Sequence, residues 1–140
     1  MPLIQERLAA EQSVKFSPRG TSMLPMLRQG IDTVTLSPIR GKLRKYDLPL
    51  YRRDNGKFVL HRIVAVGETY TCMGDNQVAP EPGLRPDQMI AVVTAFTRGD
   101  RLIPVTDPGY RLYCRIWVTA APLRKFVRRV KNRLKRMLHR

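Results

Sequence analysis

The chain has 140 residues, enough for one ordinary domain with a hydrophobic core but hardly enough for two. Hydrophobic residues make up 43% of it and charged residues 26%, a balance that argues against wholesale disorder. The formal net charge of +15 predicts a negatively charged partner surface, either nucleic-acid phosphates or anionic lipid head groups.

Cysteine usage and hydropathy narrow the class of protein further. Cys72 and Cys114 are too few for a disulfide framework, and neither lies near a second thiol or a histidine at metal-ligand spacing. We therefore expect two reduced thiols, no metal ion and no cofactor. The first residues lack the basic start and apolar core of a secretion signal, and no apolar run approaches the about 20 residues of a membrane span. We expect a cytoplasmic protein, at most peripheral at the inner membrane face.

The first part of the chain is predicted to be mainly β. Residues 1–11 form a short N-terminal segment with helical apolar spacing, and residues 12–106 form the β domain. In that domain, runs rich in Val, Ile, Thr, Tyr and Phe alternate with turn residues, as in β-hairpins. The runs are SVKF, TVTL, LPLY, KFVLHRIVAV, TYTCM, MIAVVTAF and RLIPV. The DNG sequence at 54–56 is the strongest turn signal, and residues 57–67 are long and apolar enough for a central strand.

Residues 107–140 are predicted to be an apolar connector followed by a basic amphipathic helix. Residues 122–140 contain six arginines and three lysines, nine of the 26 basic residues, and no acid. Apolar residues recur there at spacings of three and four, which gives one apolar stripe beside a cationic face on a helix. They are Leu123, Phe126, Val127, Val130, Leu134, Met137 and Leu138. Two interpretations remain open: peripheral contact with an anionic membrane, or a terminal helix packed on its own domain.

Three short segments contain candidate catalytic side chains. Ser22 lies in GTSMLPML between Gly20 and Pro25, which suit a tight, rigid turn, and a serine needs a base and nearby hydrogen-bond donors to act as a nucleophile. His61 interrupts the apolar run FVLHRIVAV, where a polar side chain needs a partner. The segment CMGDNQVAPEPG adds the carboxylates of Asp75 and Glu81. Each segment alone fits an ordinary turn or a satisfied core residue.

Together, in this order, the segments GTSMLPML, YDLPLYRR, VLHRIVAVG and MGDNQ resemble the type I signal peptidases, which share a β-rich fold with the LexA-like self-cleaving repressors. The resemblance covers about residues 12 to 100. It implies a LexA/signal-peptidase-like β fold and a serine endopeptidase that cleaves a specific peptide or leader, next to small residues such as Ala. It also implies that Ser22 is the nucleophile and His61 the general base, as in the histidine branch of the family.

The resemblance assigns the remaining site residues less directly. The family's acids correspond to Asp75, expected to be structural or orienting, and to Glu81, and the residues do not say which acid contacts His61. Thr21 and Met23 are expected near the oxyanion and the substrate. Where many members have a serine two residues before the nucleophile, this chain has Gly20, and losing one oxyanion donor can cost about 100-fold in rate. The membrane span of ordinary signal peptidases is also missing, so we expect a cytosolic or peripheral peptidase.

Two functions from other classes compete with the peptidase. One is a catalytically inactive, peptidase-like binding module that docks on an anionic membrane or an acidic partner. The other, which we rank lowest, is a LexA-like regulator associated with DNA, since phosphate contacts would also explain the charge. We expect no dedicated nucleic-acid-binding module, because fewer than about 15 residues precede the β domain in this sequence and a helix-turn-helix needs more. The expected partner is therefore a peptide substrate.

Overall fold

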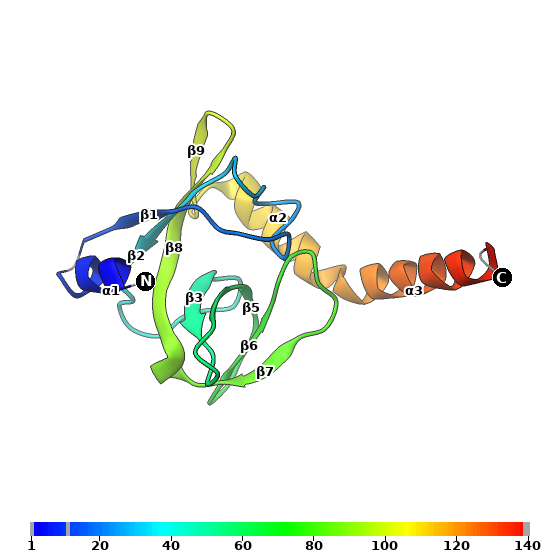
Figure 1. Ribbon diagram of the computed structural model, residues 1–140, viewed down its shortest axis with the longest axis horizontal. Coiled ribbons are helices and arrows are strands. Elements are labelled where there is room, and N and C mark those ends of the chain that lie inside the picture. Colours follow the sequence, from blue (N-terminus) through cyan, green and yellow to red (C-terminus); the bar gives the residue numbers. More distant parts are fainter. Residues whose placement is uncertain (1, 11, 139–140) are drawn as a thin grey trace.

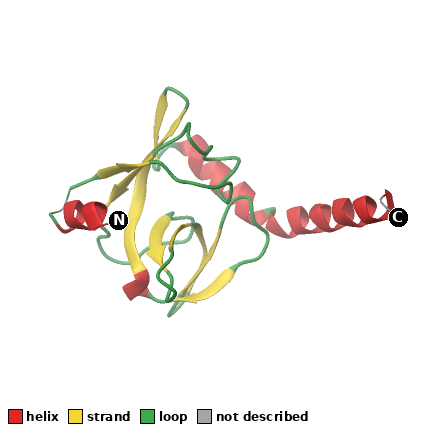
Figure 2. Cartoon of the chain, in the orientation of Figure 1, coloured by secondary structure: helices red, strands yellow, loops and turns green. Residues whose placement is uncertain are grey.

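The computed structural model describes residues 2–10 and 12–138 (Figure 1). Within these ranges the protein is mainly β, as expected, with nine strands and three α-helices (Figure 2). In chain order they are α1 (Pro2–Ala9), β1 (Val14–Phe16), β2 (Val34–Ser37), β3 (Pro49–Arg52), β4 (Phe58–Leu60), β5 (Arg62–Val66), β6 (Tyr70–Met73), β7 (Glu81–Leu84), β8 (Met89–Arg98), β9 (Arg101–Pro104), α2 (Pro108–Thr119) and α3 (Ala121–Leu138). Residues 1, 11 and 139–140, the ends of the expected N-terminal segment and of the expected helix, lie outside the described part.

The longest strand, β8, organises the larger of two antiparallel sheets. The strand order is β1-β2-β8-β3-β4, and β9 pairs with β8 as well. β3 pairs with the first half of β8 and β9 with its second half. Register shifts in β2 and β3, between Thr35 and Leu36 and between Leu50 and Tyr51, mark irregularities in the ladders. Such irregularities bend a sheet, which fits the curled form of Figure 1.

The smaller sheet has the order β5-β6-β7, and the chain enters it from the larger sheet at His61. The predicted central strand at 57–67 is therefore wrong. It is two strands, each at the edge of a different sheet, with His61 between them. An apolar run has the same pattern whether or not the chain changes sheets within it, so periodicity could not reveal the break. The predicted DNG turn is confirmed, because Arg53 N–H donates to the Lys57 carbonyl at 2.8 Å and closes the β3–β4 hairpin.

Two apolar clusters stabilise this arrangement. The larger contains buried side chains of β2, β3 and β8, the Ser22 loop and α2, among them Val34, Leu50 and Phe96. The smaller lies over the three-stranded sheet and includes Tyr51, Ile63 and Cys72. Burial of such side chains contributes about 1.5–3 kcal/mol each, so the two clusters account for the packing of the sheets.

The expected connector after residue 107 is a helix, α2. Asp107 caps its first turn, because the carboxylate accepts the Tyr110 N–H at 2.9 Å, and Pro108 suits the first helical position. Tyr110 and Cys114 face the larger cluster. A second element that the sequence did not predict is β7, whose EPGL sequence contains a proline and a glycine, residues that strands usually avoid.

Helix α3 confirms the expected amphipathic helix over its described length. Figure 1 shows it extending away from the sheets, and none of its residues is buried. Its start is fixed by two arginines: Arg124 donates to the carbonyls of Asp75 and Gln77, and Arg128 donates to that of Asn76. The apolar stripe does not pack on the domain, because all seven of its side chains are at least 42% exposed. Among the described residues, no helix is both long and apolar enough to cross a membrane.

Candidate functional site

Ser22 lies in a tight loop between β1 and β2. Leu24 N–H donates to the Thr21 carbonyl at 3.1 Å, which closes a turn that contains Ser22, and Leu27 N–H donates to the Met23 carbonyl at 3.0 Å, which closes a second turn directly after it. Gly20 begins it with φ +87°, a conformation that glycine adopts without strain. Met23 and Leu27 are buried while Ser22 is half-buried, so the loop is anchored in the core and presents the hydroxyl near the surface.

The 74–77 loop packs directly against the backbone of Ser22. Asn76 N–H donates to the Ser22 carbonyl at 2.8 Å. Gly74 lies so close that a Cβ there would be 2.5 Å from the Ser22 carbonyl oxygen, nearer than real Cβ atoms come. The glycine of the GDN motif is thus required by the approach of these two loops. Their contact fixes the carbonyl of Ser22 and, with it, the position of the residue.

A cavity of about 30 Å³ lies beside Ser22. Met23 and Leu27 of the same loop and Leu60 of β4 form part of its wall. Leu60 immediately precedes His61, and on the other side of that histidine Arg62 donates to the Met26 Sδ at 3.0 Å. In the chain, His61 thus lies between Leu60, which lines the same cavity as Ser22, and Arg62, which donates to Met26 of the Ser22 loop. Within residues 2–10 and 12–138, the hydroxyl of Ser22 makes no hydrogen bond.

His61 is linked to Glu81 through Tyr51. The Tyr51 hydroxyl donates to Glu81 Oε1 at 2.7 Å, and its oxygen lies 3.4 Å from His61 Nδ1. Arg53 also binds the Glu81 carboxylate, with both nitrogen–oxygen distances 3.0 Å. The carboxylate that reaches His61 is thus that of Glu81, and it does so through a tyrosine rather than by direct contact.

Burial and charge keep these groups in defined protonation states. Desolvation, together with the positive charge of Arg53, lowers the pKa of His61 to about 4, so its imidazole is neutral at pH 7. Burial alone would raise the pKa of Glu81, but hydrogen bonds from Arg53 and Tyr51 outweigh it and lower that pKa. Burial and the bond to Glu81 raise the pKa of Tyr51. At neutral pH the three hydrogen-bonded side chains are therefore an ionised carboxylate (Glu81), a protonated phenol (Tyr51) and a neutral imidazole (His61).

These protonation states determine the tautomer of His61. A phenol has one proton, and the 2.7 Å bond to an ionised carboxylate uses it. The Tyr51 oxygen can then only accept from His61, so we assign the imidazole proton to Nδ1. That assignment leaves Nε2 without a proton and with a free lone pair, which is the state that a general base needs. Titration near the ordinary histidine value of about 6.5 is not expected, because burial moves the pKa of His61 lower.

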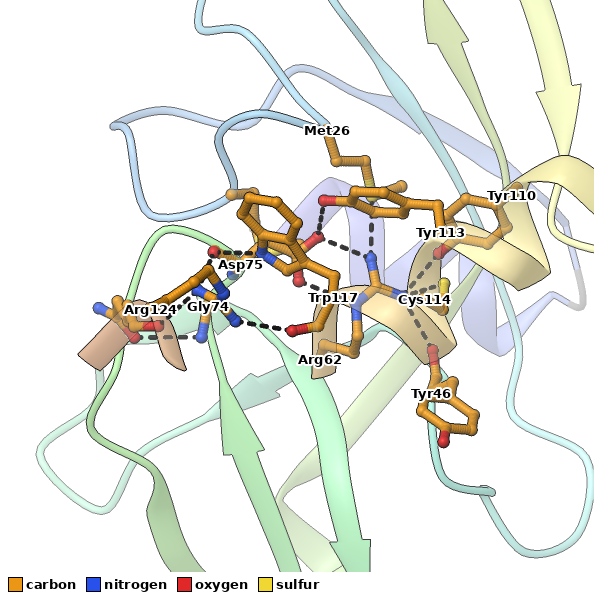
Figure 3. Close-up of polar contacts among 12 residues, drawn as sticks. Met26, Tyr46, Arg62, Gly74, Asp75, Tyr110, Tyr113, Cys114, Trp117 and Arg124 are labelled. Carbon is orange, nitrogen blue, oxygen red and sulfur yellow. Dashed lines mark hydrogen bonds and ion pairs between the residues drawn. The ribbon is translucent and has the colours of Figure 1, made fainter. Parts of the chain in front are cut away.

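Asp75 lies in a separate, buried network centred on Arg62 (Figure 3). Arg62 is 0% and Asp75 2% exposed, and they form a bidentate ion pair with distances of 2.8 and 2.9 Å. The Tyr113 hydroxyl donates to Asp75 Oδ2 at 2.7 Å. The remaining donors of Arg62 contact the carbonyl of Tyr46, the hydroxyl of Tyr110 and the sulfurs of Cys114 and Met26. The Asp75 carboxylate is therefore used to neutralise Arg62.

The same loop is attached to the C-terminal helices through its backbone. Trp117 Nε1 donates to the Asp75 carbonyl at 2.6 Å, and Arg124 donates to it at 2.9 Å while lying over the Trp117 ring, 4.5 Å from its centroid. Arg62 and Arg124 thus hold the side chain and the carbonyl of one aspartate, and Asn76 beside it holds Ser22. The C-terminal helices are part of the support of the Ser22 loop.

The predicted site residues fall into two groups in the structure. Ser22, Thr21 and Met23 share one loop, and Met23 is a core residue whose sulfur accepts the Asp75 N–H at 3.5 Å. His61 and Glu81 are joined by hydrogen bonds through the Tyr51 hydroxyl. Neither the oxyanion role of Thr21 nor the substrate role of Met23 is tested by these contacts, and both stay predictions.

Sequence reasoning missed Tyr51 and Arg53, which connect the acid to the histidine. Both lie in YDLPLYRR, and Tyr51 precedes Arg53 by two positions, as a same-face pair on an extended strand would. Comparison of the chain with protein-family models, with curated proteins and with solved structures found no match. The roles of the site residues therefore rest on the geometry above and on the resemblance of the motifs.

Proposed function

We propose that this protein is a serine endopeptidase of the signal-peptidase-like type, with a LexA-like β fold, in which Ser22 is the nucleophile and His61 the general base. The observation that carries the proposal is the hydrogen-bond chain from Glu81 through Tyr51 to His61 Nδ1. A buried, neutral histidine whose Nδ1 is occupied has only Nε2 to offer. In the chain, His61 lies between Leu60, which lines the cavity beside Ser22, and Arg62, which donates to Met26 of the Ser22 loop.

In the proposed reaction, Ser22 Oγ attacks the carbonyl carbon of the peptide bond while His61 Nε2 takes the hydroxyl proton. The backbone N–H of Ser22, assisted by Thr21, stabilises the oxyanion. The carbon–nitrogen bond then breaks as His61 returns the proton to the leaving amine. Water hydrolyses the resulting ester of Ser22, with His61 again as the base, and restores the free enzyme.

The space beside Ser22 favours a substrate with a small side chain next to the cleaved bond. A cavity of about 30 Å³ accepts a group about the size of a water molecule or a methyl, and the buried side chains of Leu60 and Leu27 form part of its wall. Alanine or glycine would fit without moving these core residues, whereas a larger side chain would displace them. The substrate class is thus a peptide or leader with a small residue at the cleavage position.

A comparison of variants on a peptide library, read by mass spectrometry, tests the proposal. Ser22→Ala and His61→Ala should each lower kcat at least about 1,000-fold. Ser17→Ala, an exposed serine five residues earlier, is the matched control and should cleave the same peptides as the wild type. Tyr51→Phe removes only the hydroxyl of the chain and should lower kcat about 10-fold or more with KM little changed, because His61 then loses its tautomer control.

Cleavage products that are identical for the wild type, Ser22→Ala and His61→Ala would contradict the proposal. Peptides that bind to the wild type without being cleaved would instead support the inactive binding module. A Tyr51→Phe variant with unchanged kcat would leave the nucleophile in place but remove the proposed role of the hydrogen-bond chain.

A further inference from the structure

The exposed apolar side chains of this protein gather on its two C-terminal helices. Of the twelve large hydrophobic residues that are exposed in the described part, two lie on α2 and seven on α3. They are Leu112, Ile116, Leu123, Phe126, Val127, Val130, Leu134, Met137 and Leu138, with exposed fractions from 42% to 81%. A surface this apolar on one side of a projecting helix marks an interaction site.

The apolar residues of α3 form one unbroken stripe. At 3.6 residues per turn, the seven side chains fall within an arc of about 120°, and no charged residue lies inside it. Lys131 and Arg133 border the arc on its two sides. Leu112 and Ile116, four residues apart, add two exposed apolar side chains on the preceding helix, α2. The two arginines that fix α3 to the 74–77 loop, Arg124 and Arg128, lie outside the stripe, so the attachment of the helix leaves it uncovered.

The rest of α3 is cationic, and the helix has no acidic residue to balance that charge. Its eighteen residues include eight Lys and Arg and no acid. Pairs four residues apart on the helix surface, such as Arg129 with Arg133 and Lys131 with Lys135, have like charge and destabilise an isolated helix. The helix therefore gains stability from any anionic surface that lies along it.

Three kinds of occupant can be compared with these features. A second copy of α3 would cover the stripe but bring the flanking cations of both helices together. Nucleic acid would neutralise the cations but leave the stripe in water, because phosphates offer it no apolar surface. An anionic bilayer satisfies both, since the stripe enters the acyl boundary while Lys and Arg meet the head groups. We propose that α3, extended by the exposed face of α2, docks the protein in the plane of an anionic lipid membrane.

Membrane docking would also place the Ser22 site near the bilayer. This consequence rests on the proposed peptidase function, whereas the docking itself does not. The start of α3 is bonded to the 74–77 loop, and Asn76 of that loop is bonded to Ser22. A helix lying on the bilayer would therefore keep the Ser22 loop close to its surface. The substrates reached most readily would be peptide segments held at the membrane.

Co-sedimentation of the full chain with vesicles tests the docking. The wild type should bind vesicles of equal parts phosphatidylcholine and phosphatidylglycerol, and bind phosphatidylcholine vesicles far less. Val130→Gln with Leu134→Gln removes apolar area from the stripe without changing charge, and should weaken binding about 10-fold or more. Lys131→Gln with Lys135→Gln keeps the stripe and should weaken binding to anionic vesicles about 30-fold. Asn132→Gln, on the face opposite the stripe, is the matched control and should bind as the wild type does.

Each other outcome overturns the proposal. A wild type that stays in the supernatant with anionic vesicles excludes the membrane. If Val130→Gln with Leu134→Gln binds vesicles like the wild type, the stripe is not the docking surface. If light scattering finds that the wild type is a dimer and that Val130→Gln with Leu134→Gln is a monomer, the stripe is the contact surface for a second copy. Binding to duplex DNA that is tighter than to vesicles and unchanged in this variant would assign the helix to nucleic acid. None of these readouts depends on peptide cleavage.

Discussion

Acid should destabilise the folded protein through His61 in particular. Its side chain is 5% exposed, and desolvation followed by the charge of Arg53 lowers its pKa to about 4, against about 6.5 in an unfolded chain. As the pH falls below about 6.5, the unfolded state binds a proton that the folded state does not accept until about pH 4. The contribution of His61 to stability is therefore complete above about pH 6.5 and is lost between these values. A difference of roughly 2.5 units corresponds to about 3 kcal/mol.

Urea denaturation between about pH 7 and pH 4 measures this effect, with His61→Asn as the matched variant. The Asn amide can donate to Tyr51 from about the position of Nδ1, but it does not titrate. Carboxylates remote from His61 titrate alike in both proteins and cancel in the difference, whereas Glu81 is coupled to His61 through their charges, so the difference reports the two groups together. From the top of the range to the bottom, the wild type should lose about 3 kcal/mol more of its unfolding free energy than His61→Asn.

Equal losses in the two proteins would refute this reasoning. His61 would then titrate near its ordinary value, in contact with water, and the tautomer assigned through Tyr51 would lose its basis. The same titration bears on catalysis. With His61 as the base, the peptidase rate should persist down to about pH 4 rather than fall with a midpoint near 6.5.

Two further predictions concern the support of the Ser22 loop. Asp75→Asn leaves the buried guanidinium of Arg62 without its counter-charge and should lower the unfolding free energy by about 3–5 kcal/mol in urea denaturation, whereas Asp54→Asn, in an exposed pair with Arg85, should change it little. An Asp75→Asn variant as stable as the wild type would contradict the structural role of that carboxylate. Gly74→Ala must move the chain away from Ser22 and should cost about 1–3 kcal/mol, while Gly67→Ala, with its nearest neighbour at 3.8 Å, should cost under about 0.5 kcal/mol. Equal thermal denaturation of these two glycine variants would show that the loops do not press on each other.

Structural features that depend on residues close together in the chain could be predicted from the sequence. Runs of strand-forming residues predicted six of the strands singly, β1, β2, β3, β6, β8 and β9, and a DNG turn predicted the β3–β4 hairpin, because both follow from local backbone preferences. The amphipathic spacing of α3 is equally local, since it needs only the helical period. β7 was missed for the same reason: its proline and glycine are poor strand formers, and pairing with β6 overrides that preference.

What the sequence by itself determined is therefore the mainly β class, the basic terminal helix and a short set of candidate side chains. Tertiary structure decided how those side chains are used, because charges and hydrogen bonds act through space rather than along the chain. In the folded protein, Asp75 forms an ion pair with Arg62 and accepts hydrogen bonds from residues of α2. His61 is linked to Glu81 through Tyr51, and the apolar run at 57–67 is divided between two sheets. The tertiary structure also left the stripe of α3 uncovered, a property of packing that no periodicity contains.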